Sequence, residues 1–192
     1  METTNKLFKA AKMPAIVTVL LLLVPLVAML FTNEVVWDET DFIVMGILIF
    51  FTGFSYKLVT MSSGDFLYKA AMGLAFITAL FLVWSNLAVG IIGSEDNAAN
   101  LMYFGVVLFL IIGSFIARFQ SKGMAYALFG TAFAQALTIG ITLVVGMQDY
   151  PGSSVYEIIM VNGFFMTLFS VSGGLFWLAA EENNGMDVET SA

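Results

Sequence analysis

Long apolar segments alternate with short polar segments along the chain. Six apolar runs span approximately residues 13–32, 42–59, 66–92, 101–117, 124–147 and 155–180. A transmembrane helix needs about 20 mainly apolar residues to cross about 30 Å of hydrocarbon. The pattern therefore predicts an all-α integral membrane protein with six transmembrane helices in a single domain, residues 1–180.

The polar segments between the apolar runs are too short to contain a soluble domain. They read NEVVWDET, KLVTMSSGD, GSEDNAAN, RFQSK and QDYPGSS. Connections of this length join antiparallel neighbours in helical bundles, so we expect three antiparallel hairpins. The last segment, residues 181–192, is polar and poor in apolar side chains, which predicts a disordered tail.

Basic and acidic residues occupy alternate connections. All seven Lys and Arg residues precede the first run or bracket the second and fourth connections: Lys6, Lys9, Lys12, Lys57, Lys69, Arg118 and Lys122. In the other connections and at the start of the sixth run, the only charged residues are acidic: Glu34, Asp38, Glu39, Asp41, Glu95, Asp96, Asp149 and Glu157. By the positive-inside rule, both termini and the disordered tail are expected to be cytoplasmic.

Composition supports a membrane protein and excludes much familiar chemistry. The residues are 60% hydrophobic and 11% charged, and the mean hydropathy is +0.95. The absence of Cys and His excludes disulfides, thiolate nucleophiles and imidazole acid–base groups. The chain also lacks G-x-S-x-G, P-loop and H-E-x-x-H motifs. We therefore predict no enzymatic activity, no cofactor and no metal centre.

The fifth apolar run contains the most polar stripe within a predicted span. Its members recur at steps of three or four residues and so share one helix face: Thr131, Gln135, Thr138, Thr142, Gly146 and Asp149. The stripe is either one wall of a hydrophilic path or a packing surface where Gln135 bonds to a neighbouring helix. We favour packing, as we do for the small residues Gly163, Thr167, Ser170 and Gly174 in the sixth run.

A second polar group is predicted at the acidic end of the helices. Asn86 shares a helix face with Asn97 and is directed toward the acidic connections. The group comprises Asn86, Glu95, Asp96, Asn97, Asn100 and Asp149, whose oxygens suit a hard cation such as Ca²⁺. The favoured alternative is that these residues are solvated or cap helices, as we predict for Asp41 and for Ser154 in the S-x-x-E sequence 154–157. The candidate site, Gln135 included, is therefore Asn86, Glu95, Asp96, Asn97, Gln135 and Asp149.

A threefold internal repeat of one hairpin is a further hypothesis. Lys9, Lys69 and Lys122 are each followed nine residues later by a threonine: Thr18, Thr78 and Thr131. The segment from Gly93 to Asp96 also aligns with that from Gly146 to Asp149.

Three stretches of the chain resemble a family of uncharacterised bacterial inner-membrane proteins. They are PLVAM with FTNEVVW at 25–37, WSNLAVGIIGSEDN at 84–97, and ARF with GMA at 117–125. The resemblance covers about the first 145 residues, and Ala98 replaces the proline of the family pattern SEDNPANLM. The family has no assigned activity, so the resemblance implies only a location, the bacterial cytoplasmic membrane.

The expected function follows from the lack of charge in the middle of any run, because ion-coupled transporters usually carry buried ionisable groups. We expect a non-enzymatic multi-pass protein that acts through helix contacts, as an accessory subunit or a self-associating scaffold. The alternative is a channel or carrier for a small neutral solute or a cation. The expected partners are the lipid bilayer, which aromatic residues such as Trp37 and Tyr103 would contact at its interfaces, and a membrane protein or a second copy, but no nucleic acid.

Overall fold

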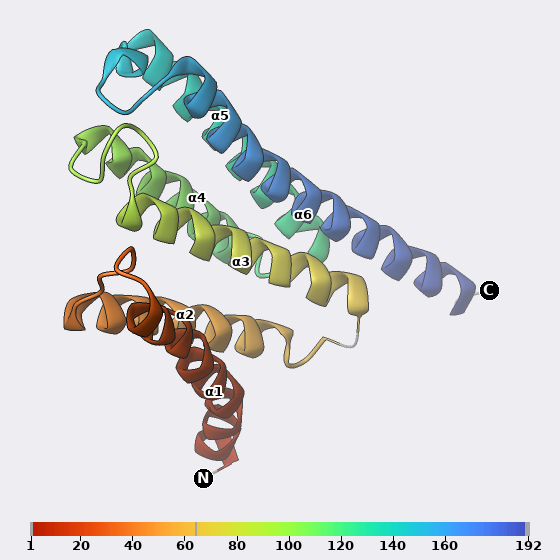
Figure 1. Ribbon diagram of the computed structural model, residues 1–192. Helices are drawn as coiled ribbons and strands as arrows, with labels where there is room; N and C mark the ends of the chain where they lie inside the picture. The colour runs from red at the N-terminus through yellow and green to blue at the C-terminus, as the bar shows by residue number, and fades with distance from the viewer. Residues whose placement is uncertain (1, 64, 191–192) are drawn as a thin grey trace. The chain divides into compact units, whose positions relative to one another are not determined.

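The computed structural model describes residues 2–63 and 65–190, and the side chains of 6–63 and 65–183 within them. The helices are α1 (Glu2–Phe31), α2 (Glu39–Thr60), α3 (Phe66–Ala88), α4 (Leu101–Ile116), α5 (Ser121–Val144) and α6 (Val155–Thr190), with 3₁₀ turns at Ala98–Asn100 and Met147–Asp149 (Figure 1). The described residues contain no strand. Six helices are long and apolar enough to cross a membrane, which confirms the all-α class and indicates a multi-pass membrane protein.

Contacts divide the chain into two compact units, Met1–Ser62 and Ser63–Ala192. In the first unit α1 packs against α2. The contact is close because α2 presents glycine: a Cβ added at Gly53 would lie 3.3 Å from the Cβ of Pro14. Few side chains of either helix are buried, and in α2 only Ile49 and Thr60 are, as expected for helices that face lipid.

The second unit is a bundle in which α6 packs along both α5 and α3, and α4 packs against α5. Its core is apolar and strongly aromatic. The large side chains that are fully buried include Phe165, Phe169 and Phe176 from α6, Met72 and Leu82 from α3, and Met124 and Leu128 from α5. A further link joins α6 to α3, since the Ser172 hydroxyl donates a 2.8 Å hydrogen bond to the carbonyl oxygen of Ala71.

Side chains in the connections set where helices begin. Asp38 is the N-cap of α2, and its carboxylate accepts the backbone N–H of Asp41 at 3.0 Å. Asp41 completes a capping box by accepting the N–H of Asp38 at 2.9 Å. The sequence prediction that Asp41 is itself the cap was therefore wrong by three positions. At α6, Ser154 accepts the N–H of Glu157 at 3.1 Å, which confirms the predicted cap.

Two helices end earlier than their apolar runs because glycines adopt left-handed backbone conformations. α3 ends at Ala88 rather than at 92, and Gly90 and Gly93 both have φ of +70°. A Cβ at Gly90 would lie 2.4 Å from the carbonyl carbon of Ser94, so no other residue fits there. α5 ends at Val144 and is followed by Gly146 with φ of +81°.

The backbone of α6 continues as a helix to Thr190. The disordered tail predicted for 181–192 therefore overlaps a helical segment, and its last two residues lie outside the described residues.

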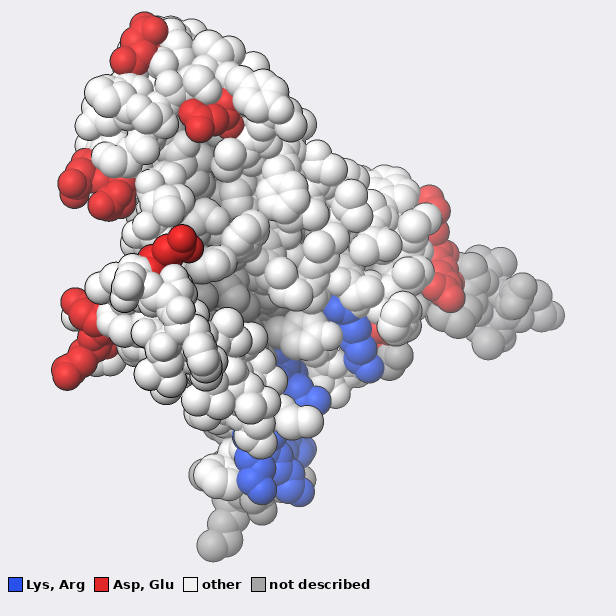
Figure 2. Space-filling view, viewed as in Figure 1, with Lys and Arg blue, Asp and Glu red and all other residues white. Residues whose placement is uncertain are grey.

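The second unit carries its basic and acidic connections at opposite ends. At one end the Tyr68 hydroxyl donates a 2.7 Å hydrogen bond to the carbonyl oxygen of Phe119, so the start of α3 meets the α4–α5 connection. Those segments hold the basic residues Lys69, Arg118 and Lys122. At the other end Asn97 Nδ2 lies 3.9 Å from Met147 Sδ, which joins the connections that hold Glu95, Asp96 and Asp149. Figure 2 shows the acidic side chains as several patches, of which some lie far from the basic side chains and others lie near them.

The three threonines of the hypothesised repeat share one local geometry. Thr18, Thr78 and Thr131 are all buried, and each donates to the carbonyl oxygen four residues earlier at 2.7–2.8 Å. Gly93 and Gly146, which the repeat also aligns, both have positive φ. Thr60, Ser114, Thr167 and Ser170, which lie outside the repeat, make the same bond, and Gly90 and Gly152 also have positive φ, so the repeat stays a prediction.

Candidate functional site

A cluster of buried polar side chains joins α5 to α6 inside the second unit. Gln135 Nε2 donates a 2.8 Å hydrogen bond to Asn162 Oδ1, which also accepts the Thr138 hydroxyl at 3.0 Å. Asn162 Nδ2 donates to the carbonyl oxygen of Ile158 at 2.7 Å. Gln135 and Asn162 have no exposed surface. Because an amide without a partner is costly in an apolar interior, this pair holds the two helices in one register.

The other threonines of the polar stripe in the fifth apolar run, Thr131 and Thr142, bond to the backbone of their own helix. The Thr131 hydroxyl donates to Ala127 O and the Thr142 hydroxyl to Thr138 O, each at 2.8 Å, and both threonines are fully buried. Asp149 does not continue this face, because α5 ends at Val144 and Asp149 lies exposed in the following 3₁₀ turn. The polar side chains of the stripe bond to their own helix or to α6, as in a packed interface, and none of these hydrogen bonds points into an open path.

Gln135 Oε1 has no hydrogen-bond partner in the described structure, and the Tyr103 hydroxyl, which interacts with Asn162 and Thr138, makes no hydrogen bond of full geometry. Tyr103 is 1% exposed and lies beside Asn162 and Thr138, so α4 also faces the cluster. The sequence prediction that Tyr103 is an anchor at the membrane interface was wrong. Asn162 was missed altogether, although an isolated carboxamide within an apolar run is the same signal that singled out Gln135.

Asn86 and Asn100 organise the acidic connection between α3 and α4. The Asn100 side-chain oxygen accepts the N–H groups of Ile91 and Ile92 at 3.1 and 2.9 Å. Its amide nitrogen donates to Ile92 O at 3.3 Å and to Ser94 O at 2.7 Å. Asn86 Nδ2 donates to Asn100 O at 3.1 Å, and both asparagines are 4% exposed. These amides serve the backbone of the loop and do not face solvent.

The remaining candidates are not gathered into one site. Glu95 and Asp96 are exposed, whereas Asn97 is buried and accepts the N–H of Ala99 at 3.0 Å. Among the described residues, no group of three or more His, Cys, Asp or Glu is placed to hold a metal ion. The structure therefore pairs Asn86 with Asn100, places Gln135 in a separate cluster, and leaves the acidic residues as solvated loop residues.

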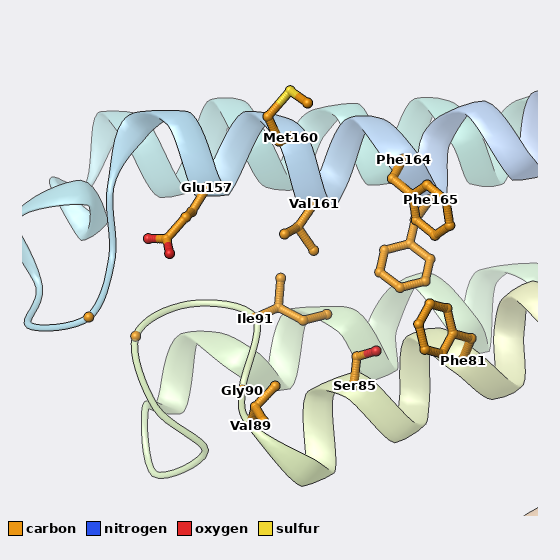
Figure 3. A pocket seen from close by; sticks show the side chains of 12 residues that line it. Phe81, Ser85, Val89, Gly90, Ile91, Glu157, Met160, Val161, Phe164 and Phe165 are labelled. Carbon is orange, nitrogen blue, oxygen red and sulfur yellow. The ribbon is translucent and has the colours of Figure 1, made fainter.

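A groove of about 540 Å³ lies between α3, the loop 89–93 and α6. Its walls are mostly apolar and aromatic, and the lining side chains that Figure 3 labels include Phe81, Ile91, Val161, Phe164 and Phe165. One carboxylate borders it: Glu157, in the first turn of α6, directs its side chain toward the loop 89–93 (Figure 3). The sequence did not single out this groove, because it forms only where α6 packs against α3.

Comparison with protein-family models, with curated proteins and with solved structures finds no match to this chain. The resemblance to a bacterial inner-membrane family therefore stays a prediction, and the function has to be argued from the structure.

Proposed function

We propose that this protein is a non-enzymatic scaffold of a bacterial cytoplasmic membrane that self-associates through an exposed face of α6. In this proposal the chain forms three hairpins with both termini in the cytoplasm. The separation of basic from acidic connections at the two ends of the second unit supports that orientation, because translocated loops of inner-membrane proteins are poor in Lys and Arg.

The observation that carries the proposal is an open face of small residues on α6. Gly163, Thr167, Ser170 and Gly174 follow one another at steps of four, three and four residues, so they share one side of the helix. A Cβ added at Gly163 or Gly174 would meet no atom within 4 Å. The buried aromatic residues Phe165, Phe169 and Phe176 lie on the other side of α6, centred about 150° away at about 100° per residue.

Small residues facing outward have a specific use in a membrane. A helix that only meets lipid gains nothing from glycine, whereas close approach of two helices requires small residues at the contact. Two copies of one protein share the same orientation in the bilayer, so α6 of each copy meets the other in parallel. The same patch then serves on both copies, which is the rule for two-fold symmetric dimers.

The alternative function, a channel or carrier for a small neutral solute or a cation, receives support from one observation. Gln135 Oε1 is a buried polar atom without a hydrogen-bond partner in the described structure, and a solute or a water molecule would satisfy it. The substitution Gln135→Leu in proteoliposomes tests this alternative: a polar path loses flux, whereas a scaffold keeps its assembly state.

Single-cysteine cross-linking tests the scaffold proposal directly. The native chain has no Cys, so a disulfide in a single-cysteine variant joins two copies. We expect Ser170→Cys to form a covalent dimer in oxidised membranes. The matched control is Leu168→Cys, which lies two residues from Ser170 but about 160° round the helix and at least about 100° from every member of the face, and it is expected to remain monomeric. Equal cross-linking of both variants, or of neither, would refute the proposed contact, and a disulfide-free complex with another membrane protein would favour the accessory-subunit role.

A further inference from the structure

The groove between α3 and α6 combines an apolar wall with one carboxylate at its end. Glu157 lies in the first turn of α6, and Phe164 and Phe165 lie seven and eight residues further along the same helix. At 1.5 Å per residue the aromatic end is therefore about 11 Å deeper along the helix than the carboxylate. Phe81 of α3 stands within 5.7 Å of the Phe165 ring centre and closes that end.

The carboxylate of Glu157 lacks a basic partner in the chain around it. The sequence has no Lys or Arg from 70 to 117 or after 122, and the groove is built from residues between 81 and 165 in those two segments. Its only hydrogen bond to a side chain in the described structure is from the Ser154 hydroxyl, at 3.1 Å to Oε2. The α6 dipole contributes about half a positive charge at this end, which is less than the full negative charge of the carboxylate.

The outer end of the groove is shaped by two glycines from different connections. A Cβ at Gly152 would lie 3.3 Å from the carbonyl oxygen of Gly93, so the two loops approach closely there. The groove has the volume of a small-molecule site, which is usually about 300–1,000 Å³. It also remains open along α6, because Glu157 and Phe164 are exposed.

We propose that this groove binds a membrane lipid whose headgroup carries a primary ammonium, such as phosphatidylethanolamine. The ammonium group lies against the Glu157 carboxylate, and one acyl chain follows the apolar wall toward Phe81, Phe164 and Phe165. This arrangement matches the orientation of a lipid in a bilayer, with its head at the end of the span and its chain toward the middle. The site is separate from the α6 face proposed for self-association and does not depend on it.

Competition between two lipids tests the proposal. The full-length protein is purified in mild detergent and mixed with equal amounts of phosphatidylethanolamine and phosphatidylglycerol that have the same acyl chains. Native mass spectrometry then counts the bound lipids. We expect a preference for phosphatidylethanolamine of about two- to fivefold, the range of a partly exposed ion pair. Glu157→Gln should abolish the preference while still serving the cap, since glutamine also fits a capping box. Glu95→Gln, an exposed carboxylate outside the groove, should leave it unchanged.

Filling the groove separates a lipid site from a general effect of charge. Val161→Phe should reduce the binding of both lipids, whereas Ile159→Phe, which lies about 160° round α6 from Val161 and does not line the groove, should not. Circular dichroism and gel filtration establish that each variant is folded, and Ser85→Leu replaces Val161→Phe if that variant is not. The proposal is overturned if the native protein shows no preference, if Glu157→Gln keeps it, or if the folded groove-filling variant binds as much lipid as the native protein.

Discussion

Replacing Asn162 by leucine should destabilise the second unit more than replacing Gln135 by leucine, although the two side chains share one hydrogen bond. Asn162 Oδ1 accepts both Gln135 Nε2 and the Thr138 hydroxyl. In Asn162→Leu, Gln135 keeps an amide with no acceptor and an oxygen that already has no donor. In Gln135→Leu, by contrast, Asn162 still accepts from Thr138 and donates to Ile158 O.

The magnitudes follow from what each variant leaves unpaired. An interhelical hydrogen bond in a membrane protein contributes about 0.6 kcal/mol on average. A buried polar group left without a partner adds about 1–3 kcal/mol. We therefore expect a loss of about 2–3 kcal/mol for Asn162→Leu and of about 1 kcal/mol or less for Gln135→Leu. Thr138 is not left unpaired, because its hydroxyl also bonds to Gln135 O at 2.7 Å.

The double variant provides the decisive comparison. Adding Gln135→Leu to Asn162→Leu removes the unpaired amide, so the pair should be more stable than Asn162→Leu alone. Equilibrium unfolding in mixed detergent micelles, followed by circular dichroism, measures all four proteins of the double-mutant cycle. If the two single losses simply add, or if Gln135→Leu costs as much as Asn162→Leu, the buried amide pair is not the link between α5 and α6 that the structure shows.

Two further predictions concern the connection between α3 and α4. Gly90→Ala should lower stability, because φ is +70° and the new Cβ would meet the Ser94 backbone. Gly105→Ala is the control: its Cβ meets no atom within 4 Å, so it should raise stability by up to about 1 kcal/mol through helix propensity in α4. Thermal unfolding distinguishes the two variants, and equal shifts would contradict the loop geometry. Asn100→Leu should speed hydrogen exchange at Ile91 and Ile92, whose N–H groups lose their acceptor, and Asn86→Leu should have a smaller effect because it removes one bond. Unchanged exchange in Asn100→Leu would refute its role in the loop.

The hydrophobic pattern predicts the helices well and their ends less well. Apolar runs of about 20 residues can form only helices in a bilayer, because every backbone group there must bond within its own segment. The pattern fails at 89–92, which are apolar yet form a loop. There the left-handed glycines end the helix, and Asn100 supplies the backbone bonds that the helix would have made.

In the candidate site too, the sequence predicted single residues but not the contacts between them. Gln135 was recognisable as a polar residue within a span, but its partner was not, because Asn162 is 27 residues away and only helix packing brings them together. Glu157 was recognised as part of a cap, yet the groove beside it also needs Phe81 from α3. The residues that line the groove come from different helices, so no single periodic pattern in the sequence reveals them together.

By itself the sequence determined the membrane class, the number of spans and the alternation of basic and acidic connections. These depend on local hydropathy and on charge, which act on each segment before any packing occurs. Tertiary structure alone decided which polar residues are bonded to one another, where the groove lies and which face of α6 stays open. Those features depend on the rotation of each helix about its axis, and that rotation is set by how its side chains pack against those of neighbouring helices, which are distant in the sequence.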